Sequence, residues 1–222
     1  MKDLFKDALI LFAITIIAGL ALGAVYEITA DARAHQAELK QKNAYIAVFD
    51  GAEGYDNVDM SAVKFEDADM VKYNGQINDA LAEAGLSQSV VIDGAVYLVS
   101  GNNTYGYVVT VTSKEGYGGD IQFTVGFDMQ GKVTGISMLS IAETAGLGMK
   151  AKEQDFLKQY VGKAGGSFVV DKDNGAGLPN EIDAISSATI TTRAVTKGVN
   201  GAYIAAAQIA GWSQTGGDTD GE

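Results

Sequence analysis

The 222-residue chain contains no cysteine, one histidine and one proline, and these shortages exclude several kinds of chemistry. Without cysteine there is no disulfide, no thiolate nucleophile, no zinc finger and no cysteine-ligated iron–sulfur cluster. The single His35 excludes zinc sites built from several histidines and haem held by two histidines. Any redox chemistry must therefore rest on carboxylates, hydroxyls or an imported organic cofactor, and we predict neither a metal site nor catalytic residues.

Positive charge is also scarce, since 16 Lys and Arg stand against 28 Asp and Glu, for a net charge of −12. This balance argues against nucleic acid and anionic lipid headgroups as partners, because both need clustered cations. Charged residues make up 20% of the chain and hydrophobic ones 47%, which is typical of a folded protein. The whole acidic excess follows position 26, because the first seven residues are neutral and the next nineteen are uncharged.

That uncharged run, ALILFAITIIAGLALGAVY at positions 8–26, is the one long apolar segment of the sequence. At about 1.5 Å per residue, a helix of that length is close to the hydrocarbon thickness of a bilayer. We interpret it as a retained transmembrane helix, after a short tail at 1–7. A cleaved signal peptide and a buried core helix are the alternatives, although signal peptides usually have shorter apolar runs. Lys and Arg flank both ends, so charge alone does not determine the orientation.

The remainder is long enough for one domain with its own core. We expect a stalk or linker over 27–60, a domain over 61–212 and a disordered acidic tail over 213–222. The segment DKDNGAG at 171–177 lacks the final glutamate of a calcium loop and is interpreted as a plain turn.

The pattern of residue types along the domain predicts the α+β class with a mainly antiparallel sheet. Helices are expected at about 62–85, 151–161 and 187–211. Four segments rich in Val, Ile, Thr and aromatics are separated by Gly-containing turns, which favours strands joined by hairpins: 88–99, 104–113, 120–128 and 131–141.

A cluster of hydroxyls lies immediately before the last predicted helix, in the sequence DAISSATITT at 183–192. A helix N-terminus has unpaired N–H groups and partial positive charge, and such a site suits a phosphate. The structural alternative is that Ser186 or Ser187 is simply the N-cap of the helix. Three threonines in one first turn are poor helix formers, which indicates that something besides helix formation places them there.

The pattern resembles the flavinylation motif Asp-x-x-[Ser/Thr]-[Gly/Ser]-Ala-Thr of the FMN-binding domains. These domains occur in the G subunit of the Rnf electron-transport complex and in the C subunit of the sodium-pumping NADH:quinone reductase. The matching positions are Asp183, Ser186, Ser187, Ala188 and Thr189, and Gly is more usual in the family where Ser187 stands. The resemblance implies that a flavin transferase joins FMN through its phosphate to Thr189 by a phosphoester bond, with Thr192 among the cofactor-binding positions.

Two further segments support this resemblance. The segment ETAGLG at 143–148 is similar to the family's Glu-Thr-Pro-Gly-Leu-Gly loop, although Ala145 replaces the proline. In the family this loop lies against the isoalloxazine ring of FMN, which implies cofactor contacts at Glu143, Thr144, Gly146, Leu147 and Gly148. The segment 115–136 resembles the preceding strand–turn–strand and brings Tyr117 and Gly118 near the cofactor. Ordinary glycine turns are the alternative for both segments.

These features occur in the family's order over essentially the whole chain, and between the two named subunits the compact length without large insertions favours the G subunit of the Rnf complex. The resemblance implies a membrane-anchored electron-transfer subunit of an ion-translocating ferredoxin:NAD oxidoreductase, with its domain on the outer, periplasmic face. Its partners would be the other membrane subunits and the flavin transferase, and the chain alone would catalyse nothing. Two other functions stay open: a pilin-like structural subunit, or a flavin-binding accessory domain outside such a complex. Pilin-like proteins have a glycine before the apolar run and a glutamate five residues into it, and neither occurs between Met1 and Val25.

Overall fold

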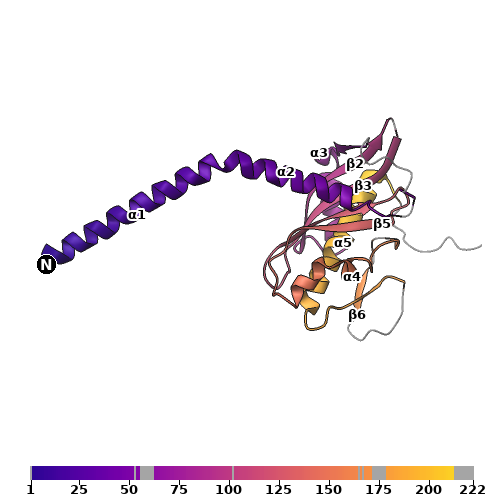
Figure 1. Cartoon of the computed structure of the whole chain (residues 1–222). Helices are drawn as coiled ribbons and strands as arrows, with labels where there is room; N and C mark the ends of the chain where they lie inside the picture. The colour runs from indigo at the N-terminus through magenta and orange to yellow at the C-terminus, as the bar shows by residue number, and fades with distance from the viewer. Residues whose placement is uncertain are drawn as a thin grey trace, which may run out of the picture. The chain divides into compact units, whose positions relative to one another are not determined.

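The computed structural model describes residues 2–52, 54–55, 63–101, 103–164, 166, 168–171 and 179–212 (Figure 1). The chain divides into two compact units, residues 1–42 and 43–222. The acidic tail predicted at 213–222, most of the turn predicted at 171–177 and the end of the linker predicted at 27–60 lie outside the described residues.

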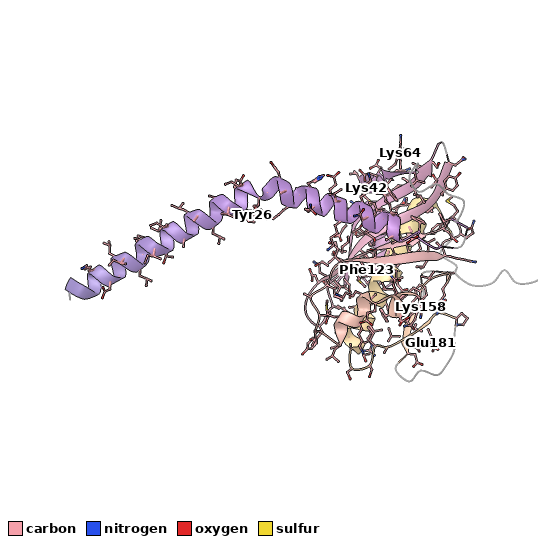
Figure 2. All side chains as sticks on the ribbon, viewed as in Figure 1. Tyr26, Lys42, Lys64, Phe123, Lys158 and Glu181 are labelled. Atoms are coloured by element: carbon pink, nitrogen blue, oxygen red, sulfur yellow. The ribbon has the colours of Figure 1, made fainter. Side chains whose placement is uncertain are left out.

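The first unit consists of helix α1, Lys2–Ile28, and most of helix α2, Ala30–Ala47. The segment Lys6–Ile28 has a mean hydropathy of 2.7 and none of it is buried, so by length and composition it is able to cross a membrane. At its end the Arg33 guanidinium lies 3.8 Å from the centre of the Tyr26 ring and donates to the Tyr26 carbonyl oxygen at 2.7 Å. This pair joins the two helices across Thr29, and Tyr26 is marked in Figure 2.

The second unit is built on a five-stranded antiparallel sheet whose strand order follows the chain. The strands are β1, Lys64–Asp67; β2, Val90–Ser100; β3, Asn103–Ser113; β4, Ile121–Phe127; and β5, Val133–Ser140. Strands β2 to β5 correspond to the four predicted segments, which confirms the α+β class with its mainly antiparallel sheet. A separate two-stranded parallel pair consists of β6, Val169–Asp171, and β7, Glu181–Asp183.

Two helix predictions need correction. The helix predicted at 62–85 includes residues 64–67, but these form β1, which pairs with β2 from Lys64 opposite Val99. The helix, α3, Met70–Glu83, begins only after Asp69, whose carboxylate accepts the Lys72 N–H at 3.3 Å as an N-cap. The helix predicted at 151–161 is a 3₁₀ turn, Gly148–Lys152, followed by the short α4, Gln154–Leu157.

One face of the sheet carries the main core and is covered by helix α5, Thr189–Ala210, which confirms the helix predicted at 187–211. Val109, Val111 and Phe123 on the strands and Val195 and Val199 on the helix are fully buried. Alternate residues of a strand point to opposite faces, so these positions form one apolar layer against α5. Phe123 is marked in Figure 2.

The opposite face of the sheet is covered by the end of α2 and the residues that follow it, at 45–52 and 55. Val48 and Phe49 are fully buried there, against Val108 of β3. Gly126 and Gly135 pair across β4 and β5, and a Cβ atom on either would approach Val48 within 2.7 Å. Glycine at this pair therefore lets the chain lie directly on the sheet.

Candidate functional site

A cleft of about 570 Å³ lies where helix α5 begins. Three segments distant in sequence form its walls: the turn between β3 and β4, the loop after β5, and the N-terminus of α5. Its volume falls in the range of about 300–1,000 Å³ that is usual for cofactor sites. The residues that line it are Tyr117, Glu143, Thr144, Leu147, Gly148, Ser187, Ala188, Thr189, Ile190 and Thr191.

The N-terminus of α5 has no side-chain cap. Its N-cap residue is Ala188, and neither Ser186 nor Ser187 bonds to the first-turn N–H groups, so the N-cap interpretation of these serines is wrong. Ser187 instead has a φ of 62°, in the left-handed region that favours glycine. The backbone thus turns sharply just before Thr189 and leaves the first N–H groups of the helix available at the cleft.

A series of hydrogen-bonded, buried hydroxyl groups outside the cleft lining holds this turn in place. The Thr192 hydroxyl accepts the Ile185 N–H and donates to the Ala188 carbonyl oxygen, both at 3.0 Å. The Thr196 hydroxyl donates to the Thr192 carbonyl oxygen at 2.8 Å, so the Tyr160 hydroxyl, 2.8 Å from Thr196, acts as donor to it. Thr192 is fully buried and lies outside the cleft lining, and its hydroxyl is engaged in holding the loop.

Glu143 provides a buried carboxylate in the cleft wall. Glu143 is 8% exposed. Its Oε1 atom accepts a hydrogen bond from the N–H of Gly118 at 3.2 Å, and this bond connects the β3–β4 turn to the loop after β5. Among the ion pairs of the described residues none involves Glu143. A buried carboxylate without a cation needs hydrogen-bond donors, and a bound ligand is able to supply them.

Three large side chains around the cleft are exposed, one from each wall. Tyr117, Leu147 and Ile190 are 71%, 41% and 54% exposed, respectively. We call these three residues the apolar rim. Apolar side chains that gather around a cleft indicate a ligand or partner that covers them.

The structure gathers most but not all of the predicted site residues around the cleft. Ser186, Gly146 and Gly118 are exposed next to lining residues, and Asp183 ends β7, where its N–H donates to the Gln159 side chain at 2.8 Å. Sequence reasoning did not single out Ile190 and Thr191 as site residues. Both lie inside the hydroxyl-rich segment 183–192 and follow Thr189 directly in the first turn of α5, and this nearness in sequence is the signal that could have found them.

The part of the chain that forms the cleft matches a known domain family. The FMN-binding domain family matches residues 116–204, which include all three walls of the cleft. A structure of the C subunit of the Na⁺-translocating NADH-quinone reductase from Parabacteroides distasonis is similar at 15% identity and a TM-score of 0.44, over 65% of this chain and 97% of that one.

Two curated relatives match over most of their length. The G subunit of the Na⁺-translocating ferredoxin:NAD⁺ oxidoreductase complex of Acetobacterium woodii is 32% identical over 200 residues, 90% of this chain and 89% of that protein. The G subunit of the proton-translocating complex of Clostridium ljungdahlii is 34% identical over 202 residues, 87% of this chain and 90% of that protein. The chain therefore belongs to the family of G subunits of ion-translocating ferredoxin:NAD⁺ oxidoreductase complexes.

Proposed function

We propose that the chain carries FMN covalently on Thr189 and transfers electrons within a membrane-bound, ion-translocating ferredoxin:NAD⁺ oxidoreductase complex. The observation that carries this proposal is the position of Thr189, which is the first residue of α5 and lines the cleft at the end of the family motif. FMN supplies the redox chemistry, since its ring accepts and releases electrons. The protein holds the ring, tunes its surroundings and excludes water.

The residues present fit FMN. The buried Glu143 carboxylate accepts hydrogen bonds, and FMN offers donors in its ring N–H and its ribityl hydroxyls. The apolar rim of Tyr117, Leu147 and Ile190 offers surfaces suited to a flat aromatic ring. The N–H groups at the start of α5 favour the phosphate, and Thr189 is the hydroxyl that lies beside them in the cleft.

The attachment step balances as a phosphoryl transfer. The Thr189 hydroxyl oxygen bonds to the flavin phosphorus of a pyrophosphate donor such as FAD. The bond between that phosphorus and the bridging oxygen breaks, AMP leaves, and the hydroxyl proton is released. The product is a phosphodiester between FMN and Thr189. A flavin transferase carries out this reaction, so Thr189 is a tether and takes no part in electron transfer.

A covalent tether suits a cofactor held in an open cleft. The rim side chains are exposed, so a reversibly bound flavin would exchange with the solvent. Helix α1 anchors the chain in the cell membrane as a single span. We place the acidic unit on the outer, periplasmic face, where the other membrane subunits of the complex exchange electrons with it.

The test is coexpression of the full chain with a flavin transferase, followed by denaturing electrophoresis. The wild-type band should fluoresce, and the peptide that spans 187–193 should be heavier by one FMN less one water. Thr189→Val should give a dark band, whereas Thr189→Ser keeps the hydroxyl and should retain label. Thr144→Val removes another hydroxyl of the cleft and should remain fluorescent.

A dark wild-type band beside an active transferase, or a fluorescent Thr189→Val band, would overturn the attachment. Membership of a complex is a separate question. Purification of the tagged chain from its native membrane in mild detergent should also recover several multi-span subunits. Recovery of the chain alone would favour the accessory flavin-binding domain instead.

A further inference from the structure

Helix α5 has an unusual charge distribution for so acidic a protein. The chain has a net charge of −12, yet the 22 residues of α5 include no Asp or Glu. Its two charged residues, Arg193 and Lys197, are both cations, and both lie in the half of the helix that begins at the cleft. A cation near a helix N-terminus gains nothing from the helix dipole, which favours anions there. The helix dipole therefore does not explain why Arg193 stands at this position.

The position of Arg193 relative to Thr189 is fixed by the helix. Residues i and i+4 lie one above the other on the same face of a helix, and side chains lean toward its N-terminus. The long Arg193 side chain on the second turn is therefore able to reach back toward Thr189 on the first, although Arg193 itself is not one of the residues that line the cleft. Arg193 is exposed, so no packing holds it away from the cleft mouth.

The two cations of α5 differ in how they are engaged. The Lys197 ammonium lies 2.6 Å from a carboxylate oxygen of Glu115, which fixes it to the β3–β4 turn. Among the described residues, Arg193 forms no comparable ion pair. Lys197 thus has a structural partner, whereas in the described part of the chain the donors of Arg193 are available to an anion that arrives with a ligand.

We infer that Arg193 binds the phosphate that becomes bonded to Thr189. This inference rests on the proposed attachment of FMN. Arginine presents several N–H donors in one plane and is suited to the oxygens of a phosphate. Before transfer, Arg193 attracts the anionic pyrophosphate donor to a domain whose net negative charge repels it. After transfer, Arg193 pairs with the single negative charge of the diester. It is a positioning residue, since the nucleophile is the Thr189 hydroxyl and the leaving group is AMP.

The test compares Arg193→Gln with Arg193→Lys and with the matched control Lys197→Gln, all in the full chain in detergent. Initial rates of flavin attachment are measured with purified transferase and limiting FAD. We expect Arg193→Gln to lower the apparent second-order rate constant about tenfold or more, since it removes a charge-assisted contact. Arg193→Lys should recover part of the rate, and Lys197→Gln should stay within about twofold of wild type. The advantage of wild type over Arg193→Gln should shrink as salt is added.

A second readout separates phosphate binding from docking of the transferase. Arg193→Gln is loaded to completion by long incubation, and the ³¹P resonance of the diester is compared with that of loaded wild type and loaded Lys197→Gln. We expect this resonance to move only in the Arg193 variant. Slower labelling with an unchanged ³¹P resonance would assign Arg193 to transferase docking and overturn the inference, as would labelling at the wild-type rate.

The two proposals fail in different ways. An unlabelled wild-type chain would remove the attachment itself, whereas a labelled wild type with an equally fast Arg193→Gln would remove only the role of Arg193. If Arg193→Gln melts well below wild type, its slow labelling could reflect misfolding. The rate of Arg193→Lys and the salt dependence of the wild-type rate then test the role of Arg193. A wild-type rate that does not fall with added salt would then contradict the inference.

Discussion

Ser187 holds the backbone conformation that turns the chain into α5, and it does so at a cost. Its φ of 62° suits glycine better than serine, because a Cβ atom crowds the backbone there. We predict that Ser187→Gly raises the free energy of unfolding by about 0.5–1 kcal/mol, measured by urea denaturation. Flavin attachment to Thr189 should be retained, since the turn keeps its shape.

The neighbouring serine supplies the control for that prediction. Ser186 is not among the residues with positive φ, so Ser186→Gly adds chain entropy to the unfolded state without relieving strain. It should be neutral or destabilising. Equal stabilisation by both substitutions would contradict the assignment of strain to Ser187.

The buried Tyr160 hydroxyl makes stability depend on alkaline pH. Burial raises the pKa of Tyr160 far above its usual value of 10.0. Above about pH 10 the unfolded chain loses this proton while the folded chain keeps it. The contribution of Tyr160 to the free energy of unfolding is therefore fully present below about pH 10. Above that pH the free energy of unfolding should fall by up to about 1.4 kcal/mol per pH unit for this one group.

Urea denaturation at several pH values between 8 and 12 checks this prediction. Tyr160→Phe should lower stability at pH 8, because it leaves the buried Thr196 hydroxyl without its donor. The variant should then lose less stability than wild type as the pH rises. Parallel pH profiles for the two proteins would show that Tyr160 ionises equally in both states.

At the scale of elements, two helical glycines have opposite roles that sequence alone does not distinguish. Gly75 lies on the exposed side of α3, and a Cβ atom there meets nothing within 4 Å. Gly198 lies in α5 against the sheet, and a Cβ atom there would approach the Phe123 ring to 2.5 Å. Glycine is thus required at the second position and merely weakens the helix at the first.

We predict that Gly75→Ala raises the free energy of unfolding by about 0.5–1 kcal/mol through helix propensity. Gly198→Ala should lower it by about 1–3 kcal/mol, because the helix or the Phe123 ring must shift. Thermal and urea unfolding of the two variants measure the difference. Stabilisation by Gly198→Ala would show that α5 does not pack on Phe123 as described.

The elements that can be predicted from the sequence are those whose signal is local. Strands β2 to β5 are rich in Val, Ile, Thr and aromatic residues and are separated by Gly-containing turns, and α5 is a long proline-free segment rich in alanine. Strand β1 escapes prediction because its four residues, KFED, have little local preference and become a strand only by pairing with β2. Thr192 belongs to the hydroxyl cluster predicted to bind the cofactor, but spacing does not reveal whether a hydroxyl faces a ligand or the backbone behind it.

At the scale of the whole molecule, the two units differ in net charge, and the packing of buried residues shows where the second unit begins. Residues 1–42 hold five Lys or Arg and five Asp or Glu, so the net charge of −12 belongs entirely to residues 43–222. The end of α2 and the chain after it are part of that acidic unit, because Tyr45, Val48 and Phe49 are buried on the face of its sheet opposite α5. The unit therefore begins with these aromatic and aliphatic contacts, ahead of the first strand.

Two truncated chains test this division. A chain of residues 43–222 should fractionate without detergent, since it lacks the apolar Lys6–Ile28 segment and keeps the acidic charge. A chain of residues 61–222 also loses Tyr45, Val48 and Phe49, and each such buried side chain contributes about 1.5–3 kcal/mol. It should unfold at a much lower urea concentration than 43–222, and the exposed face of β3 should make it aggregate. Both chains retain Thr189, so flavin attachment reports which of them folds. Equal midpoints for the two would show that residues 43–60 belong to the linker and contribute nothing to the domain.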